Sequence, residues 1–419
     1  MTDTPVATAR THPADLPEYP ILPEYPMARA AECPFAPPPA LRALQDSAPI
    51  TRVRLWDGST PWLVTGYDEM RTLLTDPRIS SDVTSPRFPF QGPGHRERLR
   101  SDPTFINMDD PEHARQRRMA TASFAVKRVE AWRPAIQKIV DGLIDTMLAG
   151  EKPVDLVEAF ALPVPSMVIC ELLGVPYADH GFFQARSRLL IKRGVSPQAA
   201  WAANQELIDY LDRLITDKLA APGDDLLSKL AVEQVAAGAL TQRELAAMGR
   251  VLLTAGHETT ANMIALGTLA LLEHPDQLAE LRDTDDPKLI AGAVEELLRY
   301  LTIVHSGRRR VAAADIEIGG QVIRAGEPVI MANDAGDWDA AAFAEPDRLD
   351  IHRDARHHVA FGFGVHQCLG QPLARVELQV VYGTLYRRIP TLRLAVDREQ
   401  IPFKHDGFVY GVYRLPVTW

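Results

Sequence analysis

Phe361-Gly362-Phe363-Gly364-Val365-His366-Gln367-Cys368-Leu369-Gly370 carries the strongest signal in this chain of 419 residues. Its three glycines indicate a backbone that turns tightly or passes close to a flat group. Cys368 stands just before a helical pattern that begins near Gln371, and the free N–H groups of a helix N-terminus favour a thiolate. A thiolate screened by Phe361 and Phe363 is a suitable axial ligand for haem iron. Taken alone, a single cysteine in such a turn is more often an inert buried residue.

The composition is that of an ordinary globular enzyme, with 46% hydrophobic and 24% charged residues. A net charge of −10 argues against general nucleic-acid binding. The widely spaced Cys33, Cys170 and Cys368 fit a reducing compartment and give no zinc or disulfide spacing. We see no secretory signal, and the longest uncharged run in the most apolar helix has 14 residues, too short to cross a bilayer. We therefore expect a cytoplasmic protein that does not enter membranes.

Helical periodicity dominates the chain, so we predict a mainly α fold with a minor β part. Thr241 and Glu244 form a capping-box signature for a long, buried helix that runs to about Glu273. We expect residues 1–33 to form a flexible arm and residues 34–419 to form one α-rich unit with a small β region. The other expected elements are a hairpin at 50–64, a short helix at 68–74, a long loop at 84–104, helices at 136–147, around Cys170, at 179–192 and at 197–220, a small sheet at 311–329, and β structure at 408–419.

Ala255-Gly256-His257-Glu258-Thr259-Thr260 lies in the middle of the long helix. A glycine, a carboxylate and two hydroxyls are costly there unless they serve a purpose. Gly256 permits the close approach of a flat group, Thr259 can hydrogen-bond to a local break or to an oxygen ligand, and Glu258 can deliver protons. A threonine-rich kink beside a solvated glutamate is the alternative.

The ten-residue stretch around Cys368 resembles, position for position, the haem-binding loop of the cytochrome P450 superfamily: Phe, two residues, Gly, one residue, His or Arg, one residue, Cys, one residue, Gly. The resemblance runs from about Pro34 to Trp419 and is strongest to the actinobacterial group that oxidises macrolides, polyketides, terpenoids and xenobiotics. It implies the P450 fold, a triangular helical prism with a long central helix and small sheets. It also implies haem b (iron protoporphyrin IX), with Cys368 as ligand to the metal. The expected reaction is the insertion of one atom of dioxygen into a lipophilic molecule, by hydroxylation or epoxidation.

The same resemblance implies roles for individual residues. Glu258 takes the acid position and Thr259 the alcohol position of the segment that delivers protons to dioxygen, so that the O–O bond breaks heterolytically. Donors to the haem propionates are expected at His113, Arg117, Arg310 and His366. The remaining expected haem contacts are Ala255, Gly256, Phe361, Gly362 and Gly370. Without the resemblance, His113 and Arg117 would more often form a solvated helix face.

A charge network of structural importance is expected from the Glu-x-x-Arg motif at Glu296 and Arg299, with Arg348 as its third member. Asp337-Trp338 departs from the family, where an amide and a basic residue are usual, and this puts the local packing in doubt. His352, His357 and His358 lack a helical ligand spacing, and we interpret them as surface or packing residues.

The resemblance implies a largely apolar substrate pocket on the haem face opposite Cys368. Its expected lining also includes the helix pair around residues 178–195. The candidate contacts are Arg87, Phe88, Phe90, Ile303, Val304, His305, Phe408 and Val409. Either Arg87 or His305 could receive a polar or acidic group of the substrate.

No flavin or nucleotide motif is present, so electrons are expected from NAD(P)H through a ferredoxin or flavodoxin and its reductase. The basic cluster Arg115, Arg118, Lys127 and Arg128 is predicted to dock that acidic carrier on a monomer. Two alternatives remain at this point: a haem-thiolate peroxygenase or nitric oxide reductase, and a haem sensor without catalytic activity.

Overall fold

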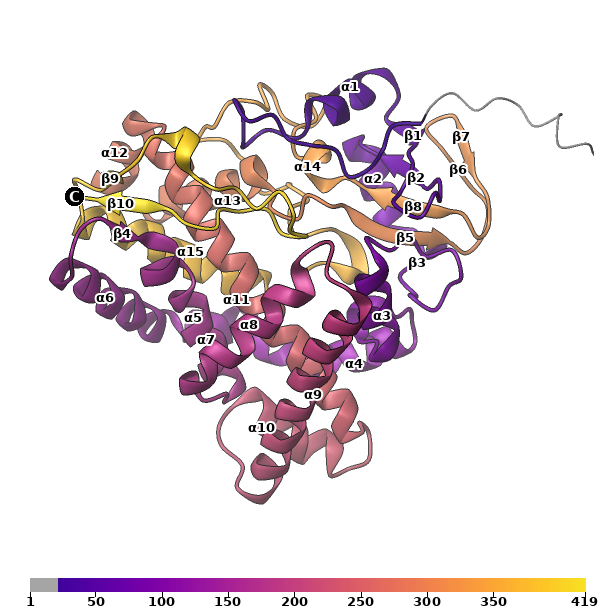
Figure 1. Ribbon diagram of the computed structural model, residues 1–419, viewed down its shortest axis with the longest axis horizontal. Coiled ribbons are helices and arrows are strands. Elements are labelled where there is room, and N and C mark those ends of the chain that lie inside the picture. Colours follow the sequence, from indigo (N-terminus) through magenta and orange to yellow (C-terminus); the bar gives the residue numbers. More distant parts are fainter. Residues whose placement is uncertain (1–21) are drawn as a thin grey trace, which may run out of the picture.

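The computed structural model describes residues 22–419, and Figure 1 shows them as a helical body with a sheet region at one side. The helices are α1 (Pro39–Ser47), α2 (Tyr67–Thr75), α3 (Pro93–Ser101), α4 (Glu112–Thr121), α5 (Val126–Glu130), α6 (Arg133–Ala149), α7 (Pro163–Leu173), α8 (His180–Ile191), α9 (Pro197–Ala220), α10 (Leu226–Leu230), α11 (Gln242–Leu272), α12 (Pro275–Asp283), α13 (Pro287–Leu301), α14 (Asn333–Gly336) and α15 (Gln371–Arg388). The strands are β1 (Ile50–Arg52), β2 (Trp62–Val64), β3 (Ile79–Ser80), β4 (Val154–Asp155), β5 (Arg308–Ala312), β6 (Ile316–Ile318), β7 (Gln321–Ile323), β8 (Pro328–Met331), β9 (Arg393–Leu394) and β10 (Pro416–Thr418). The mainly α fold with a minor β part is confirmed.

Helix α11 crosses the middle of the body (Figure 1). Its 31 residues span roughly 46 Å at about 1.5 Å per residue. The predicted capping box is present: Thr241 Oγ1 accepts from the Glu244 N–H at 3.1 Å, and the Thr241 N–H donates to Glu244 Oε2 at 2.7 Å. Residues on every side of the helix are buried, as the nearly continuous apolar sequence predicts.

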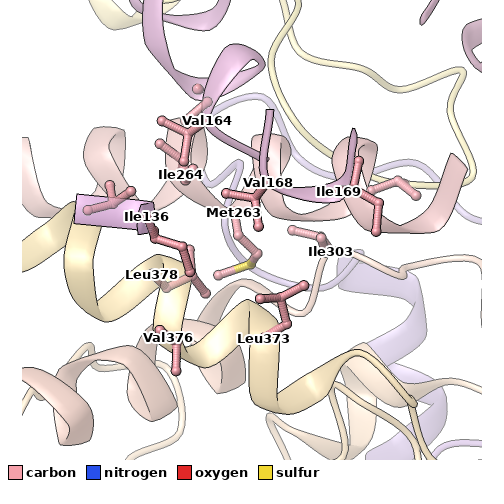
Figure 2. Close-up of a cluster of buried hydrophobic side chains, with 14 of the residues drawn as sticks. Ile136, Val164, Val168, Ile169, Met263, Ile264, Ile303, Leu373, Val376 and Leu378 are labelled. Atoms are coloured by element: carbon pink, nitrogen blue, oxygen red, sulfur yellow. The ribbon is translucent and has the colours of Figure 1, made fainter. Parts of the chain in front are cut away.

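The main hydrophobic core joins α7, α11 and α15, and Figure 2 shows the point where their side chains meet. Ile169 of α7 and Met263 of α11 face Leu373 and Leu378 of α15, with Ile303 between the layers. Helix α11 is thereby fixed against the first turns of α15, the helix that follows Cys368. The core therefore sets the separation between the Ala255–Thr260 stretch and the cysteine loop.

A five-stranded sheet with the order β1-β2-β8-β5-β3 lies beside the helical body. Strands β1 and β2 form the predicted antiparallel hairpin, with Ile50 paired to Val64. Strand β8 runs parallel to β2 and antiparallel to β5, and Arg310 pairs with Val329. The β6–β7 hairpin turns at Gly319-Gly320 as expected, with positive φ angles at both glycines. This sheet holds β5 in a fixed register next to the cysteine loop.

Three local expectations need correction. Residues 22–33 are not a flexible arm, because Tyr25 and Arg29 are buried and the Tyr25 N–H donates to the Arg54 carbonyl at 2.9 Å; residues 1–21 lie outside the described part. The loop expected at 84–104 contains α3, which packs on α9 and buries Leu99 between its arginines. The C-terminal β region is short, since only residues 416–418 form a strand.

The unusual Asp337-Trp338 pair is well accommodated. Asp337 is fully buried, and its carboxylate accepts from Thr302 Oγ1 at 2.7 Å and from the Val359 N–H at 2.6 Å. Trp338 stacks on Tyr300 with ring centroids 5.1 Å apart and donates its indole N–H to the Tyr300 carbonyl at 2.9 Å. Both residues thus fasten the end of α13 to the segment before the cysteine loop.

Candidate active site

A cavity of about 400 Å³ lies between α11 and the cysteine loop. It falls within the range of roughly 300–1,000 Å³ that is usual for small-molecule sites. Its walls come from α3, α7, α11, β5 and the start of α15, together with residues 366–370. Ala255 and Thr259 face this cavity from the middle of the long helix.

The cysteine loop is shaped by its glycines. The Cys368 N–H donates to the Phe361 carbonyl at 2.9 Å, which draws the two ends of the loop together. Gly362 and Gly364 have φ angles of +73° and +72°, in the region that favours glycine. A Cβ at Gly364 would also stand 2.2 Å from the Leu74 carbonyl oxygen. In contrast, a Cβ at Gly370 would meet only open space at the cavity wall.

Cys368 lines the cavity, and the balance of burial and neighbouring charges raises the pKa of its thiol above the ordinary value. Burial raises its pKa, whereas the charge of Arg308, the Gly370 N–H and Arg117 act in the opposite direction. The donors around the sulfur thus favour a thiolate once a further cation binds at the cavity. A metal ion is a partner of that kind.

A group of cationic and imidazole side chains gathers at one end of the cavity. The His113 and His366 rings lie 4.1 Å apart, and the Arg117 guanidinium donates to the Gln367 carbonyl at 2.6 Å. Arg308 and Arg310 stand two residues apart on β5 and both line the cavity. Burial, followed by the charge of Arg310, lowers the pKa of His366 to about 2.

Several nitrogens in this group have no hydrogen-bond partner among residues 22–419. These buried atoms are His113 Nε2, His366 Nδ1 and Arg308 Nε. Buried polar nitrogens that the protein leaves unpaired are costly, so their common position indicates a polar ligand, and the Arg308 N–H requires one that brings an acceptor. Carboxylates satisfy both the charge and the hydrogen-bonding requirement.

The opposite wall is formed by α11, where Thr259 and Glu258 point in different directions. Thr259 lines the cavity, and its hydroxyl donates to the Ala255 carbonyl at 2.7 Å. Glu258 does not line the cavity; it is 3% exposed, and its Oε1 lies 3.8 Å from His257 Nε2. Gly256 is required by α7, because a Cβ there would come within 2.8 Å of Ile169.

Comparison with known proteins gives the family. A sequence profile described as Cytochrome P450 matches residues 182–409. The chain is 56% identical to cytochrome P450 GfsF of Streptomyces halstedii over 100% of both chains. This chain belongs to the cytochrome P450 family. It is also 53% identical to pentalenic acid synthase of Streptomyces avermitilis, over 92% of this chain and 95% of that protein.

Solved P450 structures share the fold as well as the sequence. The crystal structure of GfsF superimposes with a TM-score of 0.89 at 58% identity, covering 95% of this chain and 100% of that one. The mycinamicin VIII C21 methyl hydroxylase of Micromonospora griseorubida, bound to mycinamicin VIII, gives a TM-score of 0.90 at 43% identity, covering 95% and 100%. The chain is therefore a cytochrome P450 monooxygenase with the P450 fold, and this family uses haem.

The residues present fit a haem group. Cys368 would supply a thiolate ligand, and the unpaired nitrogens of His113, Arg308 and His366 would face its two carboxylates. Open space beside Gly370 and Ala255 leaves room for a flat ring system. Phe361 also lines the cavity, whereas Gly362 does not. A Cβ added at Gly362 would lie 3.5 Å from Arg308 Nε.

Only some of the predicted substrate contacts line the cavity of this P450. Phe88, Ile303 and Val304 do. Phe90 is buried behind Phe88, with ring centroids 4.9 Å apart, and Val409 is buried in the main core. Neither lines the cavity.

Arg87 and His305, the two predicted polar contacts, do not line the cavity either. Arg87 is exposed and does not line the cavity in this structure. His305 is buried against Arg193 and the Gly407 carbonyl, outside the cavity. Phe408 lines a separate small pocket beside His95.

Sequence reasoning missed the polar residues that the structure brings into the cavity. Arg308 could have been found, because it shares a strand face with the predicted Arg310. His95 and Arg98 line the cavity from α3, the helix that was expected to be a loop. Without the helical assignment, no spacing in that segment indicates which of its arginines faces inward.

The charge network around Glu296 differs from the prediction in its third member. Glu296 and Arg299 form a fully buried two-point ion pair at 2.7 and 2.8 Å. Arg348 contributes only its carbonyl oxygen, since its side chain is 64% exposed and reaches Glu345. Arg353 is the third cation, with its Nε 3.2 Å from Glu296 Oε1. The prediction for Arg348 is therefore corrected to Arg353.

The three histidines before the cysteine loop have packing roles. His352 is exposed and pairs with Glu280 at 2.9 Å, His357 stacks on Phe343, and His358 contacts Glu295 at 3.2 Å. In the described part of the chain, no set of three or more His, Cys, Asp or Glu side chains is arranged to hold a metal ion. No helix within residues 22–419 combines the length and apolar character that crossing a bilayer requires.

Proposed function

We propose that this P450 hydroxylates or epoxidises a lipophilic secondary metabolite such as a polyketide macrolide or a terpenoid, with haem b held by Cys368. The observation that carries the proposal is the largely apolar cavity with Cys368 on one wall and Thr259 on the other. The relatives named pentalenic acid synthase and mycinamicin VIII C21 methyl hydroxylase support a substrate among secondary metabolites.

The proposed roles follow from the positions of the side chains. Thiolate-bound haem supplies the activation of dioxygen in this family. Cys368 ligates the metal, while His113, Arg117, Arg308, Arg310 and His366 bind the haem carboxylates. Thr259 offers a hydroxyl at the cavity surface, and Glu258 lies one residue away on the far side of α11 as a source of protons. Ile303, Val304 and Phe88 exclude water and orient the substrate.

The ligand assignment is tested by absorbance. The reduced, carbon-monoxide-bound protein should show the strongly red-shifted Soret band of thiolate ligation, and Cys368→Ser should lose it. Cys33→Ser is the matched control, because Cys33 is exposed and remote from the cavity lining. A red-shifted band that persists in Cys368→Ser would contradict the assignment.

The reaction is tested by turnover. A library of hydrophobic natural products should contain compounds that change the haem spin state and yield products carrying one added oxygen atom. Reductant and dioxygen should support this turnover. If hydrogen peroxide or nitric oxide is consumed instead, and dioxygen is not, the protein is a peroxygenase or a nitric oxide reductase.

Electrons are proposed to arrive from a ferredoxin or flavodoxin that docks near the cysteine loop. Arg118, Lys127 and Arg128 are exposed, and Arg117 ties α4 to that loop through the Gln367 carbonyl. Arg115 is already paired with Glu112 and Glu244 and is the least available of the predicted cluster. Lys127→Glu with Arg128→Glu should slow reduction at low salt, and an unchanged rate would defeat the proposal.

A further inference from the structure

Helix α3 presents one of its arginines to the cavity and the others to solvent. His95, Arg98 and Leu99 line the cavity, as their spacing of three and four residues allows. Arg96 and Arg100 lie on the opposite face and are exposed. The helix therefore places a single guanidinium among the largely apolar side chains of the substrate cavity.

Within residues 22–419, Arg98 has no partner of opposite charge. Its guanidinium forms no ion pair and donates to no protein acceptor within residues 22–419, and its Nε is buried. Its nearest strong electrostatic neighbour is Arg250 of α11, a group of the same charge. Burial, and then Arg250, lower the pKa of Arg98 to about 9, so the side chain remains a cation at neutral pH. An unpaired cation in such a place is costly unless a ligand pairs with it.

Three other arginines that line the cavity, Arg117, Arg309 and Arg310, donate to backbone carbonyls, whereas Arg308 belongs to the group assigned to the haem carboxylates. Arg309 donates to the Pro89 carbonyl at 2.6 Å and to the Ser306 carbonyl at 3.3 Å. Arg117 donates to the Gln367 carbonyl, and the charge of Asp102 acts on Arg250. Arg98 comes from α3, whereas the group assigned to the haem carboxylates comes from α4, β5 and the cysteine loop.

Two neutral polar side chains, His95 and Gln91, line the cavity together with Arg98. His95 accepts the Gln91 N–H at its Nδ1 at 3.2 Å, and burial lowers its pKa well below the ordinary value. The neutral ring that accepts at Nδ1 carries its proton on Nε2 and is a donor there. Gln91 donates to Ser306 Oγ at 3.1 Å. A bound acceptor group would thus meet a cation and a neutral donor together.

We propose that Arg98 binds a carboxylate carried by the substrate, with His95 as a second donor, so that the preferred substrates are lipophilic acids. This inference rests on the proposed monooxygenase function and narrows it. The carboxylate would hold one end of the molecule at α3, while the apolar part lies between Ile303 and Thr259 on the path to the metal. Arg98 is then a specificity-determining residue that takes no part in the proton transfers.

The test uses ligands whose binding does not depend on knowing the substrate. A homologous series of ω-(imidazol-1-yl)alkanoic acids, and the methyl ester of each, is titrated into the holoenzyme by the absorbance shift of imidazole ligation. The acid of suitable length should bind about 10-fold or more tightly than its ester, as expected for a charge-assisted pair in a desolvated site. In Arg98→Met that ratio should fall to about 1, and Arg98→Lys should retain part of it.

Arg96→Met is the matched control, because Arg96 lies on the solvent face of the same helix, and it should keep the wild-type ratio. The inference is overturned if acid and ester bind equally to the wild type at every chain length. It is also overturned if Arg98→Met weakens both ligands equally, which would indicate a role in haem binding or packing. The ester titration and the carbon-monoxide spectrum report on the haem site itself, so failure of this inference is distinguishable from failure of the proposed function.

Discussion

The backbone N–H of Cys368 donates to the carbonyl oxygen of Phe361 at 2.9 Å. A second bond, from the Gln367 N–H to the Gly364 carbonyl at 3.0 Å, lies inside the same loop. Together they fold the segment back on itself, so that the sulfur is presented at the cavity from a rigid backbone. Gly364 permits the tight turn of the backbone, whereas Gly370 leaves open space at the cavity wall. Substitution by alanine separates these two roles.

Gly364→Ala and Gly370→Ala should have opposite signatures. Alanine at Gly364 faces both a φ angle of +72° and a Leu74 oxygen 2.2 Å away, so we expect a loss of about 2 kcal/mol or more in the free energy of unfolding. Alanine at Gly370 meets open space, so the apoprotein should keep its stability while haem affinity falls. Chemical denaturation of the apoprotein and haem titration measure the two effects. Equal apoprotein stabilities for both variants would contradict this account.

Thr259→Ala should reduce product formed per NAD(P)H consumed, because it removes the hydroxyl that α11 presents to the cavity. A loss of proton delivery corresponds to roughly 10²-fold or more in the productive rate. Thr259→Ser keeps the hydroxyl and should keep most of the coupling. Product and peroxide are measured together in one assay. If Ala and Ser variants couple equally well, the proposed role of Thr259 is wrong.

Arg353→Ala should destabilise the protein far more than Arg348→Ala. Arg353 is bonded to the buried Glu296 and is 13% exposed, so its removal weakens a buried pair and should cost about 2–4 kcal/mol. Arg348 is 64% exposed, and its removal should change stability by no more than about 0.5 kcal/mol. Urea unfolding of both variants decides between Arg353 and the residue that the motif predicts.

Asp337 should make the protein less stable as pH rises from about 4 to about 6. Burial raises its pKa to about 6 in the folded state, whereas an unfolded aspartate titrates near pH 4. Over this interval the unfolded chain ionises first, so folding loses roughly 3 kcal/mol in total from this group. Asp337→Asn removes the effect, and its stability relative to wild type should improve by up to that amount across the interval. Thermal unfolding at several pH values measures it, and a constant difference between the two proteins would exclude the mechanism.

The strongest local patterns predicted their structures correctly. The capping box at Thr241 and the Gly319-Gly320 turn are decided by neighbouring residues, so the sequence carries the full signal. The inward arginine of α3 was missed because nothing local distinguishes Arg98 from Arg96 or Arg100. The sequence after the Glu-x-x-Arg motif does not distinguish Arg348 from Arg353 as the third member of the charge network. Only the burial of the two side chains separates them.

The amino-acid sequence by itself determined the chemistry on the cysteine side of this P450. The spacing of Gly362, Gly364, His366 and Cys368 is a short-range property, and the loop geometry follows from it. The tertiary structure alone decided what the opposite wall contains. It placed Glu258, Arg87 and His305 outside the cavity lining and Arg98 within it, because side-chain direction depends on how the helices and loops pack against one another.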